Sequence, residues 1–281
     1  MTRLLFKAFS ALSALSALSA ATAAGFLISS PTATAASAAG TAQAAGAAHL
    51  TAAQIVERNA AARGGTQAWR AVNSMTMSGQ LDVGGKKNTM LPFVMTMKRP
   101  HKSRFEVRFQ DKTAFQVYDG TQGWKVRPFL GRNDVEPFTP DEAKSAAAAA
   151  ELDGPLIDYA SKGTKVEALG TEFVEGHRAY VLKLTAKDNS SRRVWIDAAN
   201  FLELKMDGEP RKLDGRMHNV AIFYRDYRKE NGLVMPHTFE TVVTGVKETR
   251  KLKIDHVTVN QPADDALFAK PQLAGAKLAN H

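Results

Sequence analysis

The feature that most constrains the fold of this chain is a long succession of short segments in which apolar and polar residues alternate. The succession runs from Met75 to Asn260, and turns rich in Gly, Asn and Asp separate its segments. Alternation with a period of two residues is typical of half-buried strands, and such turns are typical of hairpins. We therefore predict a mainly β protein in which about eleven strands form one antiparallel sheet, strongly twisted or curled towards a barrel.

Two helical segments are expected beside this sheet, at about residues 51–72 and 139–162. Capping boxes begin at Thr51 and Thr139, and Pro140 occupies the first helical position of the second segment. The second segment is rich in alanine, which favours a helix but offers little side chain to bury. We expect it to form a light cover that includes a short second helix in "GPLIDYASKG". Four apolar side chains would anchor this cover: Leu152, Leu156, Ile157 and Tyr159.

Residues 1–38 have the pattern of a secretory signal, with two basic residues, an uncharged stretch of Leu, Ala, Phe and Ser, and then small residues. A transmembrane anchor is the alternative, but alanine and serine make the segment weakly hydrophobic for a spanning helix. The position of cleavage stays open. We expect a flexible Ala-rich leader at 39–49, one domain at 50–272 and a C-terminal tail at 273–281.

The composition excludes several classes of site. The chain contains no cysteine, which excludes disulfides, thiolate metal sites, thiol catalysis and lipid attachment through a lipobox. The net charge is +9, but the basic residues are dispersed and form no long run. We therefore expect no nucleic-acid partner. Transient contact with an anionic membrane surface stays open, beside the simpler interpretation of a solvated basic surface.

Residues suited to catalysis form no recognisable pattern. Five histidines are scattered along the strands and turns: His101, His177, His218, His237 and His256. None forms an HxH or HExxH motif, and the chain has no nucleophile elbow, phosphate-binding loop or dinucleotide fingerprint. We interpret Asp197, Asp264 and Asp265 as turn and loop residues. The sequence predicts no catalytic activity, metal or cofactor; a hydrolase whose residues converge only in three dimensions is the alternative.

Large apolar side chains recur on shared strand faces, and a single curled sheet has a concave face that only the helices can cover. Methionine adapts well to varied apolar guests. We therefore predict a cavity for a lipophilic ligand, with an ordinary hydrophobic core as the alternative. The residues expected to line it are Met75, Met77, Met95, Met97, Phe105, Val107 and Phe109. Arg99 has the same parity as Met95 and Met97, so it would face the interior and need acceptors there.

Several motifs resemble those of LolA-type periplasmic lipoprotein carriers. A strand ends in Lys98-Arg99-Pro100, an aromatic strand follows, and Asp119-Gly120, Trp124 and Pro128-Phe129 come next in the same order. The segments "RRVWID", "FLELK" and "VNQPADDALFAKP" are also similar to that group. The resemblance runs from about residue 51 to 271. The chain departs from it by extra length before residue 163 and by an N-terminal segment closer to the broader sorting-protein-like group.

The resemblance implies an unclosed antiparallel β-barrel with a helical lid over an apolar cavity that accepts acyl chains. In LolA proteins the arginine of the Lys-Arg-Pro segment bonds the lid, and this latch role would fall on Arg99. Trp124 and Phe129 join the expected lining. The implied function is a monomeric periplasmic carrier of lipids or lipoprotein acyl chains that contacts a membrane protein or membrane transiently. A sensor or regulatory module built on the same fold is the alternative.

Overall fold

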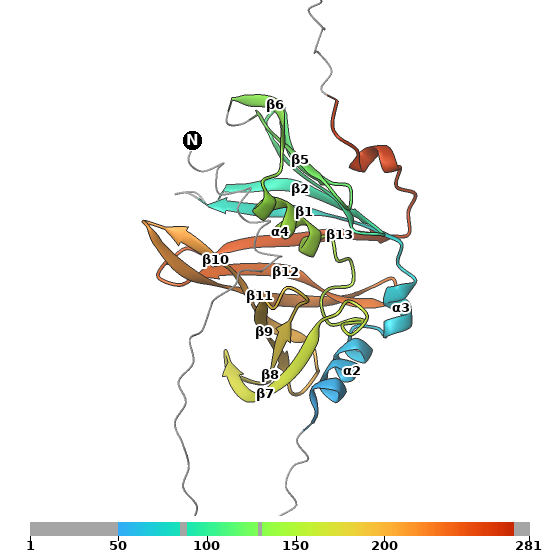
Figure 1. Ribbon diagram of the computed structural model, residues 1–281, viewed down its shortest axis with the longest axis vertical. Coiled ribbons are helices and arrows are strands. Elements are labelled where there is room, and N and C mark those ends of the chain that lie inside the picture. The colour runs from blue at the N-terminus through green and yellow to red at the C-terminus, as the bar shows by residue number, and fades with distance from the viewer. Residues whose placement is uncertain (1–49, 85–88, 129–130, 273–281) are drawn as a thin grey trace, which may run out of the picture.

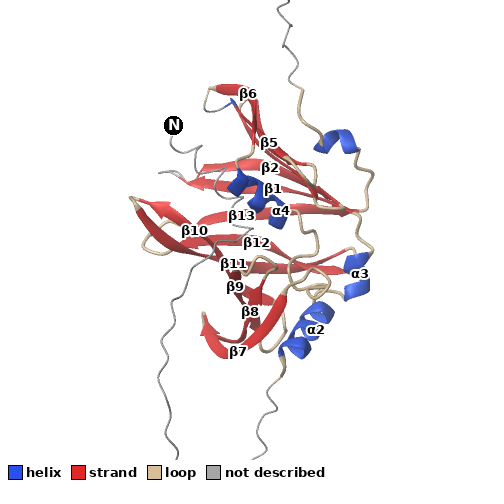
Figure 2. Cartoon of the chain, viewed as in Figure 1, coloured by secondary structure: helices blue, strands red, loops and turns tan. Residues whose placement is uncertain are grey.

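The computed structural model describes residues 50–84, 89–128 and 131–272. The predicted signal peptide, leader and C-terminal tail lie outside the described residues. Strands dominate the part that is described, and the few helices lie at one end of the sheet or across its curved face (Figures 1 and 2). The helices are α2 (Ala52–Ala62), α3 (Thr66–Arg70), α4 (Pro140–Ala149) and the one-turn 3-10 helix η3 (Asp265–Phe268).

The strands all belong to one antiparallel sheet. They are β1 (Ser74–Gly84), β2 (Thr89–Lys98), β3 (Lys102–Phe109), β4 (Lys112–Tyr118), β5 (Gly123–Arg127), β6 (Arg132–Pro137), β7 (Lys165–Val174), β8 (His177–Thr185), β9 (Ser191–Asp197), β10 (Glu203–Leu213), β11 (Arg216–Glu230), β12 (Leu233–Val243) and β13 (Arg250–Val259).

The strand order is β6-β5-β4-β3-β2-β1-β13-β12-β11-β10-β9-β8-β7, so β6 and β7 are the two edges and the sheet is not closed. The mainly β, curled and unclosed architecture predicted from the sequence is therefore confirmed. The described residues form 13 strands rather than about eleven. One addition is β6, which pairs with β5 in a stretch expected to lie outside the sheet.

Register shifts help the sheet to curl, because an extra residue in one strand bends it and increases its twist. One shift lies at Gly79 of β1, where an added Cβ would be 1.9 Å from the carbonyl oxygen of Lys253. Another follows Gly208 of β10, where an added Cβ would be 2.8 Å from a methyl group of Val220. Glycine at these two positions therefore permits the close approach of neighbouring strands.

Helix α2 begins at the predicted capping box, in which the Thr51 hydroxyl accepts a hydrogen bond from the Gln54 backbone. Its buried face includes Ile55 and Val56, which pack with side chains of β8, β9 and β10. In Figure 1 the helix lies against the lower part of the sheet, next to β7 and β8. The first predicted helical segment is thus a pair of short helices that covers one end of the concave face.

The connection from β6 to β7 joins the two edges of the sheet and so runs across its concave side (Figure 1). We call residues 140–163 of this connection the covering segment. The predicted first helix forms as α4, but the second short helix predicted in "GPLIDYASKG" is wrong, because turns follow α4 as far as residue 163. Asp158 has φ 53°, a left-handed conformation that a helix does not accept. Of the four predicted anchors, Leu152, Leu156 and Ile157 are buried, and Tyr159 is partly buried against a core cluster.

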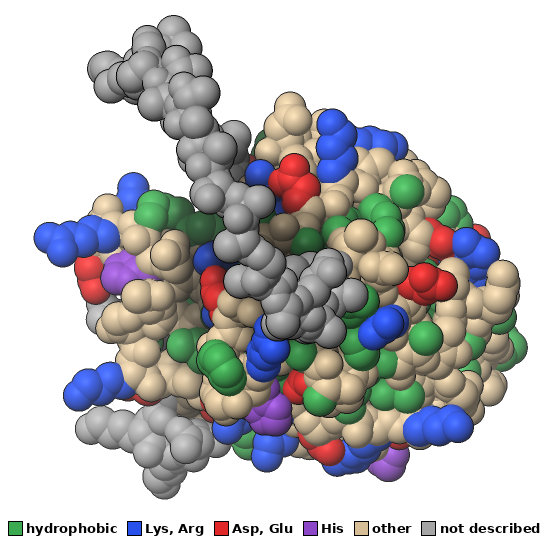
Figure 3. Space-filling model, turned by 90° about the horizontal axis from the view of Figure 1, so that it is seen from below, with side chains coloured by type: hydrophobic (Ala, Val, Ile, Leu, Met, Phe, Trp, Pro, Cys, Tyr) green, Lys and Arg blue, Asp and Glu red, His purple; other side chains and the backbone are tan. Residues whose placement is uncertain are grey.

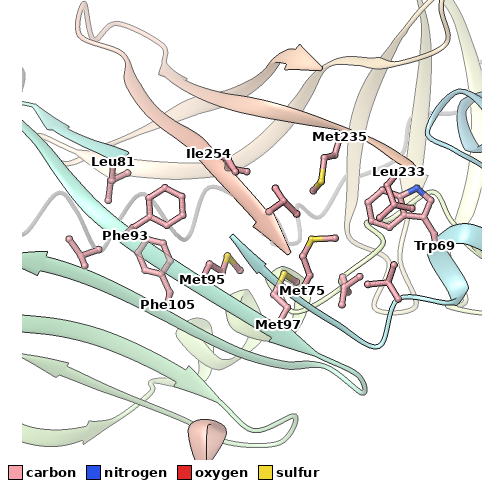
Figure 4. Close-up of a cluster of buried hydrophobic side chains, with 14 of the residues drawn as sticks. Trp69, Met75, Leu81, Phe93, Met95, Met97, Phe105, Leu233, Met235 and Ile254 are labelled. Carbon is pink, nitrogen blue, oxygen red and sulfur yellow. The ribbon is translucent and has the colours of Figure 1, made fainter. Parts of the chain in front are cut away.

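The largest core cluster lies where β1, β2 and β3 face β12 and β13. Figure 4 shows its methionines and phenylalanines pointing towards one another from these strands. Phe93 and Phe105 stack with ring centroids 5.6 Å apart. Trp69 of α3 closes the cluster at the end near the helices. The apolar face of the sheet is therefore concave, and its two arms are bridged by the covering segment.

Candidate functional site

A cavity of about 550 Å³ lies between the two arms of the sheet and the covering segment. This volume falls within the range of about 300–1,000 Å³ that is typical of small-molecule sites. Six methionines contribute to its wall: Met75, Met77, Met95, Met97, Met206 and Met235. Aromatic side chains complete the apolar part of the wall: Trp69, Phe93, Tyr118, Tyr224, Tyr227 and Phe239.

Four of the residues expected to line the cavity do so, namely Met75, Met77, Met95 and Met97. Phe105 and Val107 lie on the same face beside Met95 and Phe93, with which they pair in the sheet register, but they are buried and do not border the cavity. Phe109 is partly buried and packs against the same cluster. These three side chains therefore support the wall instead of forming its surface.

The assignment of Trp124 to the cavity is wrong. Trp124 pairs with Val117, which pairs with Arg104, and this row of side chains faces the outer side of the sheet. The neighbouring interior position belongs to Lys125, whose ammonium group pairs with Glu142 of α4. Phe129, the other aromatic residue expected there, lies outside the described residues.

The second half of the chain supplies wall residues that the sequence prediction missed. Met235 and Phe239 lie four residues apart on β12 and both face the cavity. Met206 of β10 lies opposite Val194 of β9, and both line the cavity. The period-two alternation of these strands was the available signal, but it does not distinguish a cavity wall from an ordinary core.

Arg99 joins three parts of the molecule. Its Nε donates to the carbonyl oxygen of Val72 at 2.8 Å, and its Nη2 donates to that of Trp69 at 3.2 Å. The same Nη2 lies 2.8 Å from Oδ2 of Asp153 in the covering segment. Carbonyl groups at the end of a helix lack partners within the helix, so α3 offers the acceptors that this guanidinium needs. Arg99 thus contacts the covering segment as the sequence prediction requires.

Asp153 of the covering segment accepts hydrogen bonds from three cationic side chains. Its side chain is only 3% exposed. It accepts a hydrogen bond from Lys162 in addition to the one from Arg99. Arg63 donates to the backbone carbonyl of Asp153 at 3.0 Å and stacks over the ring of Trp69 at 4.4 Å. Charge-assisted hydrogen bonds therefore hold the turns of the covering segment to Arg63 at the end of α2 and to Arg99 at the end of β2.

Helix α4 is fastened to both arms of the sheet. On one side Glu142 pairs with Lys125 of β5, and on the other Ser145 donates to Glu209 of β10 at 2.9 Å. Lys144 lies 2.8 Å from Asp188, in the turn between β8 and β9. Most of these partners keep solvent contact, so each bond can exchange with water at modest cost.

These contacts shift the ionisation of the acids that make them. Burial raises the pKa of Asp188, but hydrogen bonds from Lys144 and Ser190 outweigh it and lower the pKa from 3.8 to about 2. Burial likewise opposes the hydrogen bonds from Lys125 and Thr139 at Glu142, and the net pKa is lowered. Both acids are therefore charged at neutral pH, when the covering segment is held in place.

The cavity also contains polar groups at its deep end. Tyr227 donates to the Glu203 carboxylate at 3.0 Å, and that carboxylate lies 3.5 Å from the Arg63 guanidinium. Burial, with a smaller effect of Glu203, raises the pKa of Tyr224 well above its ordinary value, so this phenol stays neutral. Arg192 borders the cavity beside them, and burial lowers the pKa of its guanidinium.

The candidate catalytic residues have structural partners instead. The Asp197 side chain accepts hydrogen bonds from the backbone of Ala199 and Asn200, and Asp264 accepts one from Ala266, so the interpretation as turn residues is confirmed. Among the described residues, no group of three or more His, Asp or Glu side chains is arranged to hold a metal ion.

Lysine, arginine and acidic side chains are interspersed over the face that Figure 3 shows.

Comparison with solved structures defines the fold. A LolA superfamily protein from Nitrosomonas europaea aligns with a TM-score of 0.53 at 15% identity, over 79% of this chain and 99% of the other. A putative outer membrane lipoprotein-sorting protein domain from Vibrio parahaemolyticus aligns with a TM-score of 0.51 at 14% identity, over 77% and 95%. The chain has a LolA-like fold. This likeness defines the arrangement of strands and is too distant in sequence to transfer a ligand.

Two further comparisons limit what the LolA-like fold implies. A family model described as an uncharacterized protein matches residues 158–274, which is less than half of the chain. No curated protein matches the sequence.

Within the described part of the chain, no helix combines the length and hydrophobicity needed to cross a membrane.

Proposed function

We propose that this chain is a periplasmic carrier that binds a lipophilic ligand, the acyl chains of a lipid or lipoprotein, in the cavity beneath the covering segment. The observation that carries the proposal is the wall of six methionines around a cavity of about 550 Å³. Methionine is flexible and polarisable, so such a wall suits acyl chains of varied length and shape. Localisation in the periplasm rests on the secretory pattern of residues 1–38 and on the LolA-like fold.

Binding and release would have different physical origins. Burial of an acyl chain contributes about 0.8 kcal/mol per methylene group, which makes capture favourable. Release needs the covering segment to move, and Arg99, Asp153 and the contacts of α4 hold that segment. A carrier of this kind acts without catalysis and as a monomer, because one sheet supplies both arms of the cavity.

The hairpin between β10 and β11 is the proposed contact with an anionic membrane surface. Leu213 and Met217 flank its turn with 36% and 65% of their surfaces exposed. Lys212 and Arg216 pair with them across the hairpin and are exposed as well. Exposed apolar side chains beside cations suit a surface of acidic lipid headgroups, since the two interactions reinforce each other.

The experiment that tests the carrier function is uptake of a dansyl-labelled fatty acid by the purified, delipidated chain. The proposal expects a saturable rise in fluorescence with one site per chain, displaced by unlabelled lipid. It also expects the loaded protein to pass the probe to acceptor vesicles. Saturable uptake without transfer would favour a sensor module, and absence of any saturable uptake would contradict lipid binding altogether.

A further inference from the structure

Arg192 occupies an interior position of the sheet. On β9 it has the same parity as Val194, which lines the cavity, and it lies opposite Leu184 of β8. Its side chain borders the cavity and also a smaller pocket of about 130 Å³ next to it. Thr164, the residue that follows the covering segment, borders both spaces too. A permanent positive charge therefore borders a cavity whose wall is mainly apolar.

The other two arginines that enter this region have polar partners in the protein. Arg63 contacts Glu203 and the Asp153 carbonyl, and Arg99 has three acceptors. Within residues 50–84, 89–128 and 131–272, by contrast, the Arg192 guanidinium makes no hydrogen bond, ion pair or ring contact, and only the long-range electrostatic effects of Tyr224 and Glu209 reach it. Arg192 is partly buried, so its guanidinium has lost part of its hydration and would gain from an anion that enters the cavity.

The neighbouring groups of the protein do not supply that anion at contact distance. Tyr224 is neutral at physiological pH because burial raises its pKa. Glu209 attracts Arg192 from a distance, but its two carboxylate oxygens accept hydrogen bonds from Ser145 at 2.9 and 3.1 Å. Glu209 thus attracts Arg192 at long range, while the N–H donors of the Arg192 guanidinium are unpaired beside a space that a ligand can enter.

We propose that Arg192 binds the anionic head of an amphiphile, a carboxylate or phosphate, whose acyl chain lies along the methionine wall. The inference rests on the proposed function and narrows its ligand from any lipophilic molecule to an acidic one. A guanidinium presents paired donors that match the oxygens of a carboxylate or phosphate, and such charge-assisted bonds are strong in a site with little water. The Thr164 hydroxyl provides a further donor next to the head.

The test compares ligands with the same chain and different heads. Palmitic acid, hexadecanol and inorganic phosphate are each used to displace the dansyl-labelled fatty acid from the delipidated full chain. The wild-type protein is expected to bind the acid at least about tenfold more tightly than the alcohol, as one charge-assisted pair provides. Inorganic phosphate, which has no chain, is expected not to displace the probe.

Two variants assign the preference to Arg192. Arg192→Gln is expected to abolish the preference for acid while the affinity for hexadecanol stays within about twofold. Arg192→Lys should retain part of the preference for the acid over the alcohol. Arg193→Gln is the matched control, because Arg193 points to the outer face of the same strand, where it pairs with Asp207. It should leave both affinities unchanged.

Four results would overturn the inference. Equal affinity of the wild-type protein for acid and alcohol would remove the headgroup preference while leaving the carrier function intact. An equal loss of both affinities in Arg192→Gln would show a structural role only. Displacement of the probe by inorganic phosphate that depends on Arg192 would indicate a site for a free oxyanion. Binding of no ligand at all would refute the proposed function and this inference together.

Discussion

The Nη2 atom of Arg99 lies 2.8 Å from Oδ2 of Asp153, so the end of β2 is tied directly to the covering segment. The same guanidinium bonds the carbonyl groups of Val72 and Trp69. One side chain therefore couples the methionine-bearing strand, helix α3 and the cover of the cavity. Movement of the cover requires this side chain to give up bonds, which makes it the first position to test.

Arg99→Leu is expected to release a bound fatty acid about tenfold faster, because a charge-assisted hydrogen bond to the cover is lost. The sheet should stay folded, with unfolding free energy lowered by about 1–3 kcal/mol. Stopped-flow dissociation of the dansyl-labelled probe measures the first effect and urea unfolding the second. Lys98→Leu is the matched control, because Lys98 bonds Ala263 and Asp265 on the outer face. Equal release rates in both variants and the wild type would exclude the latch role.

Ligand retention should change with pH only in the acidic range. The pKa of Asp188 is lowered from 3.8 to about 2 in the closed structure, and the pKa of Glu142 is lowered as well. A lowered pKa means that the contact stabilises closure fully above the ordinary pKa and loses this effect as pH falls towards the lowered one. Release rates should therefore be flat from about pH 8 to 5 and rise below about pH 4. A rise that is already complete at about pH 5 would contradict the assignment of the pH dependence to these two acids.

Filling the cavity should reduce binding without unfolding the protein. Met77 is partly buried and lines the cavity, so the indole of Met77→Trp would occupy space that a ligand needs. We expect a lower stoichiometry of probe uptake, with a change in stability no larger than the roughly 1–3 kcal/mol typical of overpacking. Fluorescence titration and urea unfolding check the two parts. Met217→Trp, at an exposed position away from the cavity, is the control and should bind like the wild type.

The covering segment should detach when its apolar anchor is shortened. Ile157 is 1% exposed and packs in the cluster around Met75 and Trp69. Ile157→Ala is expected to cost about 2–5 kcal/mol of local packing. Hydrogen exchange should then accelerate in residues 150–163 more than in β1, since the segment opens before the sheet does. Uniform acceleration over both regions would mean that the cover and sheet unfold as one unit.

Membrane contact should depend on the β10–β11 hairpin. The double variant Leu213→Asp, Met217→Asp is expected to lower binding to vesicles rich in anionic lipid, because it removes apolar contact and adds negative charge. Leu169→Asp, Phe173→Asp makes the same charge change at exposed residues of the edge strand β7 and serves as the control. Vesicle sedimentation measures both. An equal loss in the two variants would indicate net charge alone as the cause.

Local signals in the sequence predicted much of the fold. The capping boxes at Thr51 and Thr139 form as expected, because they depend only on residues three positions apart. A short helix was expected in "GPLIDYASKG", but turns stand in its place. The actual path of residues 150–163 depends on partners far away: Asp153 meets Arg99, and Asp158 meets Arg70. Strand β6 was missed because its exposed, polar sequence carries no alternation.

The residues of the candidate site were also predicted only in part from the sequence. Parity along β1 and β2 placed the four methionines of the first half on the cavity wall and Arg99 near its acceptors. The same reasoning failed at Trp124, because Lys125 occupies the interior position of β5. Lys125 pairs there with Glu142 of α4, seventeen residues later in the chain. Arg192 has the same parity as Val194 in the sequence, but only the three-dimensional structure distinguishes its unpaired state from that of an ordinary surface arginine.

The most direct test of the account is native mass spectrometry of the chain purified from the periplasm, followed by solvent extraction and lipid analysis. The account predicts a fraction of the protein with added mass that extraction identifies as an acyl lipid, and it predicts loss of this fraction in Met77→Trp. A wild-type protein that carries no lipid, and takes up none when lipid is supplied, would contradict the claim that the cavity holds a lipophilic ligand.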